Sequence, residues 1–293
     1  MKITFGRRTA VVGILSSMAV LFCLPSMAFA GTILGSAQSF AVLGAQTVTN
    51  TGPTIVSGDL GVYSGSSITG FPPGTVDNGT LHTAADAVVG QAQNDERYAY
   101  NTLAALPFTI DKSGIDLSGL TLTPGVYRFS SGATLNGPLA LTLDFQGNSD
   151  ALFVFQIATT LITGSATSVN VVNGTDTDGI FWVVGSSATL GSTTAFAGNI
   201  LALTSISLDT GAKIECGRAF AQTGGVTMDD NLISGNCSVN NLGSERSDFG
   251  SGGFSPTSSL QIITPEPGTF LLFGISLSLG LAGLTLKHSA RQK

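Results

Sequence analysis

A four-residue pattern recurs about every 20 residues through the second half of the chain, and it constrains the fold more than any other feature of the sequence. The last residue of each copy is large and apolar, and the residue before it is Thr or Ser. The copies are Gly132-Ala133-Thr134-Leu135, Ala158-Thr159-Thr160-Leu161, Ser187-Ala188-Thr189-Leu190, Ser205-Ile206-Ser207-Leu208 and Gly225-Val226-Thr227-Met228. Successive copies lie 26, 29, 18 and 20 residues apart, and the longest interval contains an inserted turn at residues 173–179. A repeat of this length predicts the rungs of a β-solenoid, in which the apolar residue points inward.

Composition agrees with short strands joined by tight turns. The chain has 38 glycines among 293 residues, and charged residues make up only 10%, against roughly 25% in an ordinary soluble domain. One segment differs, because residues 83–105 contain no Pro and a single Gly. Thr83 and Asp86 resemble a capping box at its start, and Pro107 would stop a helix at its end. We therefore expect a mainly β protein, a β-solenoid with one long α-helix packed against a sheet.

The charge of the chain is unevenly distributed. The formal net charge is −6, but the two ends, residues 1–30 and 287–293, hold half of the 12 basic residues and no acid. The segment between them has 6 basic against 18 acidic residues, a net charge of −12. A domain with this charge would repel a phosphate backbone, so the sequence argues against nucleic acid as a partner.

The first 30 residues are typical of a secretory signal. Basic residues precede the apolar run of residues 10–24, and Ala28-Phe29-Ala30 supplies the small residues that signal peptidase requires. We expect the mature chain to begin at Gly31 and to be exported across the inner membrane.

The end of the chain predicts a sorting signal. Pro265, Glu266 and Pro267 precede the uncharged residues 269–286, a stretch just long enough to cross a bilayer, and a basic tail follows. This order, over residues 265–293, resembles the PEP-CTERM signal. The resemblance implies a Gram-negative bacterium, transient anchoring in its inner membrane, removal of the anchor by an exosortase, and a secreted or cell-surface protein, often alongside exopolysaccharide. A plain membrane anchor is the alternative.

Residues 240–264, rich in Ser and Gly, are expected to form a flexible linker, which leaves residues 31–239 as one domain.

Two cysteines support the stacked repeat. Cys216 and Cys237 lie 21 residues apart, about one rung, and an exported protein meets an oxidising compartment, so we expect a disulfide between neighbouring rungs. Cys23 would leave with the signal, so the mature chain would have an even number of cysteines. A metal site is not expected, because His82 is the only histidine before the basic tail and no ligand spacing is present.

Further motifs resemble those of one family. They are Ser36-Ala37-Gln38-Ser39-Phe40-Ala41-Val42-Leu43, Thr47-Val48-Thr49-Asn50-Thr51-Gly52, Gly58-Asp59-Leu60-Gly61-Val62, Ile68-Thr69-Gly70-Phe71-Pro72-Pro73-Gly74, Leu122-Thr123-Pro124-Gly125-Val126-Tyr127, Phe153-Val154-Phe155-Gln156-Ile157 and Phe196-Ala197-Gly198-Asn199-Ile200-Leu201-Ala202. In this order, from about residue 34 to residue 233, they resemble the DUF3494 ice-binding family. The resemblance implies a discontinuous β-solenoid with one long helix alongside, and adsorption to an ice crystal surface through a flat solenoid face.

The repeat itself offers a candidate for that face. Because side chains alternate along a strand, the Thr or Ser before each inward residue points outward, and stacked rungs bring these hydroxyls into line about 4.7–4.9 Å apart. The candidate residues are Thr134, Thr160, Thr189, Ser207 and Thr227. Ser187 and Ser205 lie two residues before Thr189 and Ser207, so they are expected on the same face. Thr is also an ordinary residue of strand surfaces. Asp209 and Asp229, just after inward positions, would place charge beside the face.

Two other functions fit parts of the sequence. Some β-solenoid enzymes cleave acidic polysaccharides with stacked carboxylates that hold Ca²⁺, and such a group would combine Asp209, Asp229 and Asp230 with Lys213 and Arg218. These residues offer too few oxygens for the six to eight ligands of Ca²⁺, so we expect no catalytic residue, no cofactor and no metal. The other alternative is a matrix or adhesin-like protein that binds exopolysaccharide, which the sorting signal fits as well as it fits ice binding.

Overall fold

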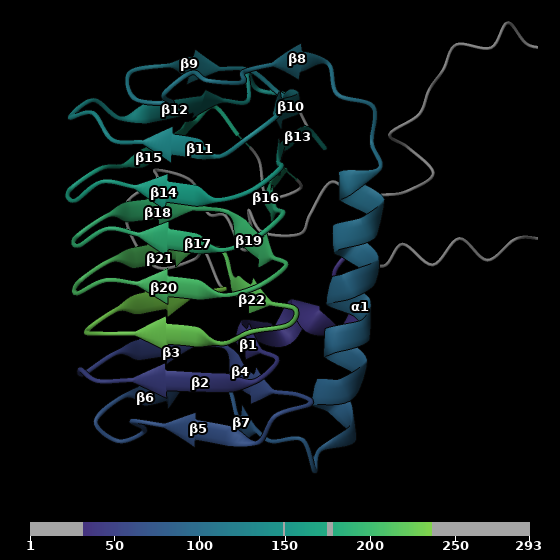
Figure 1. The fold of residues 1–293 in the computed structure, drawn as a ribbon, viewed down its shortest axis with the longest axis vertical. Coiled ribbons are helices and arrows are strands. Elements are labelled where there is room, and N and C mark those ends of the chain that lie inside the picture. Colours follow the sequence, from purple (N-terminus) through teal and green to yellow (C-terminus); the bar gives the residue numbers. More distant parts are fainter. Residues whose placement is uncertain (1–31, 149, 175–177, 236–293) are drawn as a thin grey trace, which may run out of the picture. The chain divides into compact units, whose positions relative to one another are not determined.

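The computed structural model describes residues 32–148, 150–174 and 178–235, which form a β-solenoid with one long helix along its side (Figure 1). Neighbouring strands in each sheet are parallel. Each complete rung contributes one short strand to each of three sides, so strands three apart in the chain become neighbours in a sheet. The predicted mainly β solenoid with a helix alongside is confirmed.

The three sides are sheet A, sheet B and a third side made of two smaller sheets. Sheet A contains, from one end to the other, β7 (Leu81–His82), β4 (Asp59–Val62), β1 (Phe40–Gly44), β22 (Ala219–Ala221), β19 (Asn199–Ala202), β16 (Gly179–Val184), β13 (Leu152–Ile157), β10 (Gly125–Phe129) and β8 (Ile110–Asp111). Sheet B contains β11 (Ala133–Leu135), β14 (Leu161–Thr163), β17 (Ala188–Leu190), β20 (Ile206–Leu208), β23 (Val226–Met228), β2 (Thr47–Asn50) and β5 (Ser67–Thr69). The third side contains β9 (Thr121–Leu122), β12 (Leu141–Asp144) and β15 (Val169–Val172), followed by β18 (Ala195–Ala197), β21 (Lys213–Cys216), β24 (Leu232–Ser234), β3 (Ile55–Ser57) and β6 (Thr75–Asp77).

The order of rungs in space differs from their order in the chain. The first rung of the chain pairs with the last one on all three sides, through Val42 with Ala219, Thr49 with Thr227 and Val56 with Ile233. The chain then passes from β7, at one end of sheet A, to β8, at the other end, by way of the helix α1 (Ala87–Ala104). The solenoid is therefore discontinuous, as the family resemblance implied.

Helix α1 forms where the sequence predicts it, but it begins one turn later than the capping-box pattern indicates. Asp86, rather than Thr83, is the N-cap residue, and its carboxylate accepts a hydrogen bond from the Thr83 backbone N–H at 3.0 Å. The helix ends at Ala104, shortly before Pro107. There Gln156 of β13 donates its side-chain amide to the Leu103 carbonyl at 2.9 Å, and to two further carbonyls of this end.

Apolar side chains fill two layers. One lies inside the solenoid, where Phe155 and Trp182 stack with ring centroids 3.9 Å apart and the Trp182 indole N–H donates to the Ala197 carbonyl at 3.0 Å. The other lies between sheet A and the helices α1 and η1 (Gly35–Ser39), around Phe181 and Phe220. Because sheet A is covered on its outer side as well, every residue of β16 is buried.

The predicted terminal segments lie outside the described residues. This applies to the signal at residues 1–30, the linker at 240–264, and the sorting signal with Pro265, Glu266, Pro267 and the span at 269–286. Within the described ranges, no helix has the length and apolar character needed to cross a membrane. The same ranges contain no cluster of His, Cys, Asp and Glu that could hold a metal ion.

Candidate functional site

Outward side chains of sheet B form two parallel columns, which we call the hydroxyl face. The ladder register aligns one column as Thr134, Ile162, Thr189, Ser207, Thr227, Thr49 and Thr69. Two positions earlier on each strand, the same register aligns Gly132, Thr160, Ser187, Ser205, Gly225, Thr47 and Ser67. All seven predicted residues therefore lie on one face of one sheet.

The position of Thr160 corrects the predicted alignment. The pattern placed Thr160 beside Thr189, but Leu161 pairs with Ala188 and Ile162 pairs with Thr189, so Thr160 stands next to Ser187 in the second column. The reason is that β14 exchanges the usual residue types, with an apolar residue at the outward position and a Thr at the inward position that follows. Ile162 points outward and is 42% exposed, whereas Thr163 points inward and is buried.

Burial of Thr163 is possible because its hydroxyl has partners inside the solenoid. Its Oγ1 lies 3.0 Å from the Thr194 Oγ1 and accepts a hydrogen bond from the Gly191 backbone N–H at 3.0 Å. A buried hydroxyl that is hydrogen-bonded avoids most of the cost of leaving water. The rung therefore tolerates a polar residue at an inward position, which an alignment based on apolar residues cannot anticipate.

Sequence reasoning missed the part of the face that comes from the N-terminal rungs. Thr47, Thr49, Ser67 and Thr69 extend both columns beyond Thr227. The Thr49 hydroxyl donates to the Thr227 hydroxyl at 3.3 Å, across a separation of 178 residues in the chain. The alternation in Thr47-Val48-Thr49 was a usable signal, but its place next to β23 depends on pairing between distant segments.

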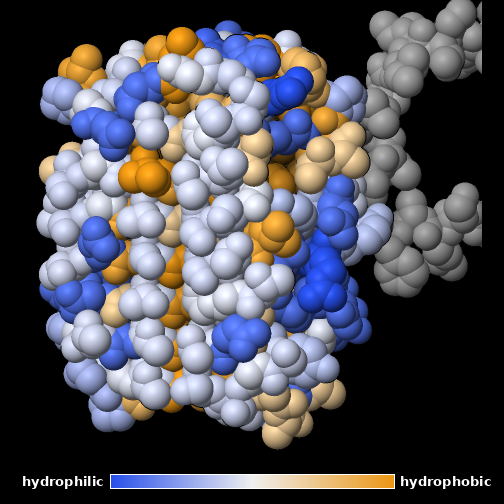
Figure 2. Space-filling model, viewed as in Figure 1, coloured by the Kyte–Doolittle hydropathy of each residue, from blue (hydrophilic) through white to orange (hydrophobic). Residues whose placement is uncertain are grey.

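The hydroxyl face carries no charged residue in either column. The described members are Thr, Ser, Gly and one Ile, and the strands that bear them are three or four residues long. Figure 2 shows pale residues over the strands of sheet B, while strongly hydrophilic residues gather along α1 and at the margins. The face is thus a regular surface of small hydroxyl and methyl groups.

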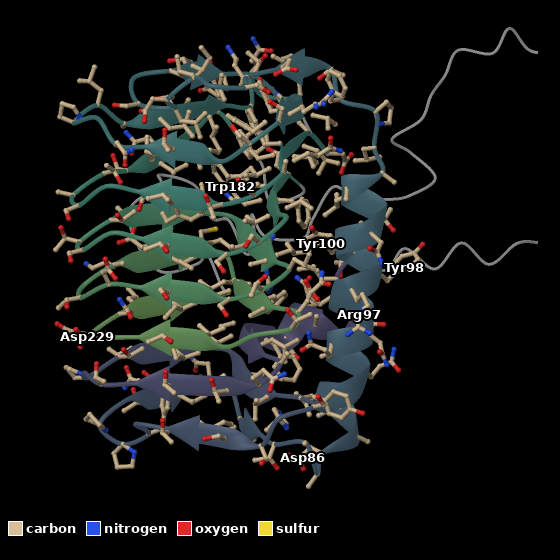
Figure 3. All side chains as sticks on the ribbon, viewed as in Figure 1. Asp86, Arg97, Tyr98, Tyr100, Trp182 and Asp229 are labelled. Carbon is tan, nitrogen blue, oxygen red and sulfur yellow. The ribbon has the colours of Figure 1, made fainter. Side chains whose placement is uncertain are left out.

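Carboxylates lie at the edges of this face, where they accept hydrogen bonds from threonine hydroxyls. Asp229 accepts hydrogen bonds from the Thr210 hydroxyl at 2.5 Å and from the Thr51 hydroxyl at 3.0 Å, and these bonds lower its pKa. Figure 3 shows Asp229 at the turn end of its strand, on the side of the solenoid away from α1. At one end of the first column, Asp116 accepts a hydrogen bond from Thr134 at 2.7 Å.

Two residues of the alternative polysaccharide-cleaving site, Arg218 and Asp229, are hydrogen-bonded to other groups of the solenoid. Arg218 is buried, and its guanidinium donates to the Gln38 carbonyl at 2.7 Å and to the Asn199 side-chain oxygen at 3.1 Å. Asp229 is occupied by threonine hydroxyls, as described above. Each of these groups therefore stabilises a local structure of the solenoid.

The other two sides of the solenoid are less suited to a flat uncharged contact. Helix α1 and η1 pack on the outer side of sheet A. On the third side, Lys213, Glu215 and Asp77 are exposed on β21 and β6. Sheet B is the one side of the described solenoid with outward columns that are both uncovered and uncharged.

Only one member of the predicted disulfide lies in the described part of the chain. Cys216, at the end of β21, is buried and disulfide-bonded. Cys237 lies outside the described residues, so the Cys216–Cys237 pairing stays a prediction.

Comparison with known proteins identifies the family. A model of the family described as "Ice-binding-like" matches residues 42–234. The chain belongs to this family. An ice-binding protein of Nostoc sp. (strain HG1) is 57% identical over 206 residues, which cover 70% of this chain and 75% of that protein.

Solved structures of the ice-binding-like family share the fold. An ice-binding protein from an Antarctic biological consortium has a TM-score of 0.65 at 45% identity, over 69% of this chain and 90% of that one. An ice-binding protein from the Antarctic ascomycete Antarctomyces psychrotrophicus has a TM-score of 0.64 at 41% identity, over 70% of this chain and 98% of that one. Membership of this family agrees with the expectation that the chain is not an enzyme.

Proposed function

We propose that the protein is an ice-binding protein that adsorbs to ice through the hydroxyl face of sheet B. The observation that carries this proposal is the pair of uncharged Thr/Ser columns, which run over seven neighbouring strands. Names and structures of the relatives support ice as the partner. Charged groups hold their hydration water strongly, so a face without them is better suited to share water with a crystal.

The proposed mechanism is ordering of water on a rigid ladder. Rungs about 4.7–4.9 Å apart set a regular spacing of hydroxyls and methyls along the columns. The β-branch of Thr restricts χ1, so little side-chain freedom is lost on contact with ice. Because a crystal surface repeats, many weak contacts form at once and act as a multivalent interaction.

Thr189→Tyr tests the face at its most informative position. Thr189 stands between Ile162 and Ser207 near the middle of the first column, and its side chain is only partly exposed. A phenol ring would rise above the neighbouring side chains and separate the face from a flat crystal. We expect loss of most thermal hysteresis and of partition into ice, with the circular dichroism spectrum and melting temperature nearly unchanged.

Thr142→Tyr is the matched control. Thr142 is an outward, partly exposed Thr on a central strand of the third side, where it pairs with Thr121 and Asn170. The same substitution there should leave ice activity intact. Full activity in both Thr189→Tyr and Thr49→Tyr would place the ice contact on another side. If the unmodified protein neither shapes ice crystals nor enters ice, the binding hypothesis itself fails.

We further propose that the protein acts outside the cytoplasm. Ala28-Phe29-Ala30 supports cleavage by signal peptidase before Gly31, and Pro265-Glu266-Pro267 before the apolar residues 269–286 supports transient inner-membrane anchoring and exosortase processing in a Gram-negative bacterium. Mass spectrometry of the form released by its host should find a chain that starts at Gly31 and ends before the span. An extracellular form that retains residues 269–286 would contradict processing and leave a plain anchor.

A further inference from the structure

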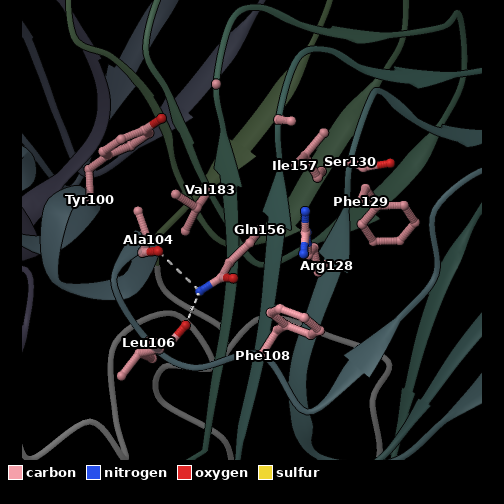
Figure 4. A pocket seen from close by; sticks show the side chains of 12 residues that line it. Tyr100, Ala104, Leu106, Phe108, Arg128, Phe129, Ser130, Gln156, Ile157 and Val183 are labelled. Atoms are coloured by element: carbon pink, nitrogen blue, oxygen red, sulfur yellow. Dashed lines mark hydrogen bonds between the residues drawn. The ribbon is translucent and has the colours of Figure 1, made fainter.

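We propose that the pocket at the C-terminal end of α1 binds a neutral sugar ring, as one residue of a polysaccharide. This helix-end pocket has a volume of about 460 Å³, within the range of about 300–1,000 Å³ typical of small-molecule sites. Its polar groups come from Tyr100, Arg128, Ser130 and Gln156, and Phe108 supplies an exposed aromatic ring (Figure 4). The proposal adds a second ligand to the ice-binding function and does not depend on it.

A fixed acceptor in the pocket is the first part of the argument. The Gln156 amide nitrogen donates to the carbonyls of Leu103, Ala104 and Leu106 at 2.9, 3.3 and 2.8 Å. These three acceptors determine which side of the amide carries nitrogen, so the amide cannot flip without losing them. The Gln156 oxygen consequently points away from the helix end, toward the side of the pocket with Phe108 and Arg128 (Figure 4). Within the described residues, no donor occupies that oxygen.

A donor and an aromatic surface complete the set. The Arg128 guanidinium carbon lies 4.9 Å from the centroid of the Phe108 ring, which holds the planar group in place. A sugar hydroxyl can donate to a fixed carbonyl oxygen and accept from a guanidinium at the same time. The exposed ring of Phe108 offers a surface for the C–H groups of the sugar, whereas Ile157 and Val183, which also line the pocket, are 3% and 2% exposed.

Charge favours a neutral sugar over an acidic one. Asp111 of β8 is the register partner of Arg128 in β10, so a carboxylate lies near the guanidinium and partly offsets its charge. The segment between the basic ends has a net charge of −12, which would repel a polyanion. An uncharged pyranose avoids both penalties and still uses the donor and the acceptor.

The location is compatible with ice binding. Ser130 and Ala158 lie at the corner where sheet A continues into β11 and β14 of sheet B. The pocket therefore opens beside the hydroxyl face and does not occupy either of its columns. A polysaccharide held there would lie next to adsorbed ice.

Titration of the purified full chain with single sugars tests the proposal. D-glucose, D-galactose, D-mannose and N-acetyl-D-glucosamine would each be added while backbone amide resonances are recorded, with D-glucuronate as the charged comparison. We expect saturable shifts for at least one neutral sugar, at residues that line the pocket, with a Kd on the order of 1 mM. No saturable shift with any neutral sugar, or tighter binding of glucuronate, would overturn the proposal.

Variants then assign the binding to this pocket. Arg128→Met and Phe108→Ala alter exposed side chains, so the fold should persist, and each should weaken binding about tenfold, the effect of losing roughly 1.4 kcal/mol. Arg97→Met is the control, because Arg97 is an exposed arginine of α1 that does not line this pocket. Thermal hysteresis should stay unchanged in all three. Unchanged sugar affinity in both pocket variants would refute the assignment of sugar binding to this pocket. An unmodified chain without ice activity would instead contradict the proposed function of the hydroxyl face and would leave the sugar result unaffected.

Discussion

Replacing Glu96 with Gln should stabilise the protein, and the gain should grow with pH. Glu96 lies on the side of α1 that faces sheet A and is fully buried. Burial raises its pKa from 4.5 to about 8, although a hydrogen bond from Gln222 and the charge of Arg97 act in the opposite direction. The Gln222 amide donates to one carboxyl oxygen at 3.2 Å, and the other oxygen has no hydrogen-bond partner within the described structure.

The size of the effect follows from the two pKa values. Below pH 4.5 the carboxyl is protonated in both the folded and the unfolded chain, so it does not affect stability. Between pH 4.5 and 8 the folded chain holds a proton that the unfolded chain has released, and the free energy of unfolding falls as pH rises. The cost reaches about 3 kcal/mol at pH 7 and about 5 kcal/mol at pH 9, since one pKa unit corresponds to about 1.36 kcal/mol.

Urea unfolding at pH 4, 7 and 9 measures this directly. Glu96→Gln keeps the shape of the side chain and the acceptor for Gln222 but cannot ionise. We expect the variant to match the unmodified protein at pH 4 and to exceed its free energy of unfolding by about 3 kcal/mol at pH 7 and about 5 kcal/mol at pH 9. A difference that is the same at all three pH values would refute the reasoning, because it would show that Glu96 does not change its protonation in this range.

Three further predictions concern stability. Burial alone would raise the pKa of Asp95, but hydrogen bonds from the Ser36 hydroxyl at 2.6 Å and backbone N–H at 2.7 Å outweigh it and lower the pKa. Asp95→Asn should therefore reduce the free energy of unfolding at pH 7 in urea titrations, by no more than about 1 kcal/mol because solvent screens this partly exposed carboxylate, and by less at pH 3, where protonation of the carboxylate weakens the same hydrogen bonds. Thr163→Val should cost about 1 kcal/mol in the same assay, because the Thr194 hydroxyl and the Gly191 N–H would each lose one buried partner, while the Gly191 N–H keeps the Thr163 carbonyl at 3.2 Å; an unchanged midpoint would count against that role. Non-reducing peptide mapping should find Cys216 joined to Cys237, and loss of the bond should lower stability by about 3 kcal/mol without abolishing the fold. Free thiols on both residues, in protein from an oxidising compartment, would refute the pairing.

The repeat was sufficient to predict the solenoid and most of the candidate face. Strand periodicity sends Thr189 and Ser207 outward whenever Leu190 and Leu208 point inward, and the ladder has this arrangement. The error at Thr160 has a local cause, since β14 buries a hydrogen-bonded Thr163 and exposes Ile162. No pattern of apolar residues contains that information.

Other features depend on contacts between distant segments. Gln156 caps α1 from a strand about 50 residues further along the chain, which gives no signal within either element. Helix α1 begins later than predicted, because Asp86 is its N-cap residue and Thr83 lies outside the helix. The rungs of Thr49 and Thr69 join the face through pairing of β2 with β23, and here the family resemblance, rather than local pattern, indicated that the solenoid is discontinuous.

Discontinuity also determines how the protein can be shortened, and when it can become active. In a solenoid wound in chain order, removal of C-terminal residues trims one end. Here β23 lies between β20 and β2, so its loss would divide the ladder into two separate pieces and expose unpaired strand edges in its centre. Because the first and last rungs must meet, the contact surface can be completed only after the whole domain has been synthesised and released. Contacts this far apart in sequence slow folding, and a truncated product of translation or proteolysis would lack a continuous lattice of hydroxyls.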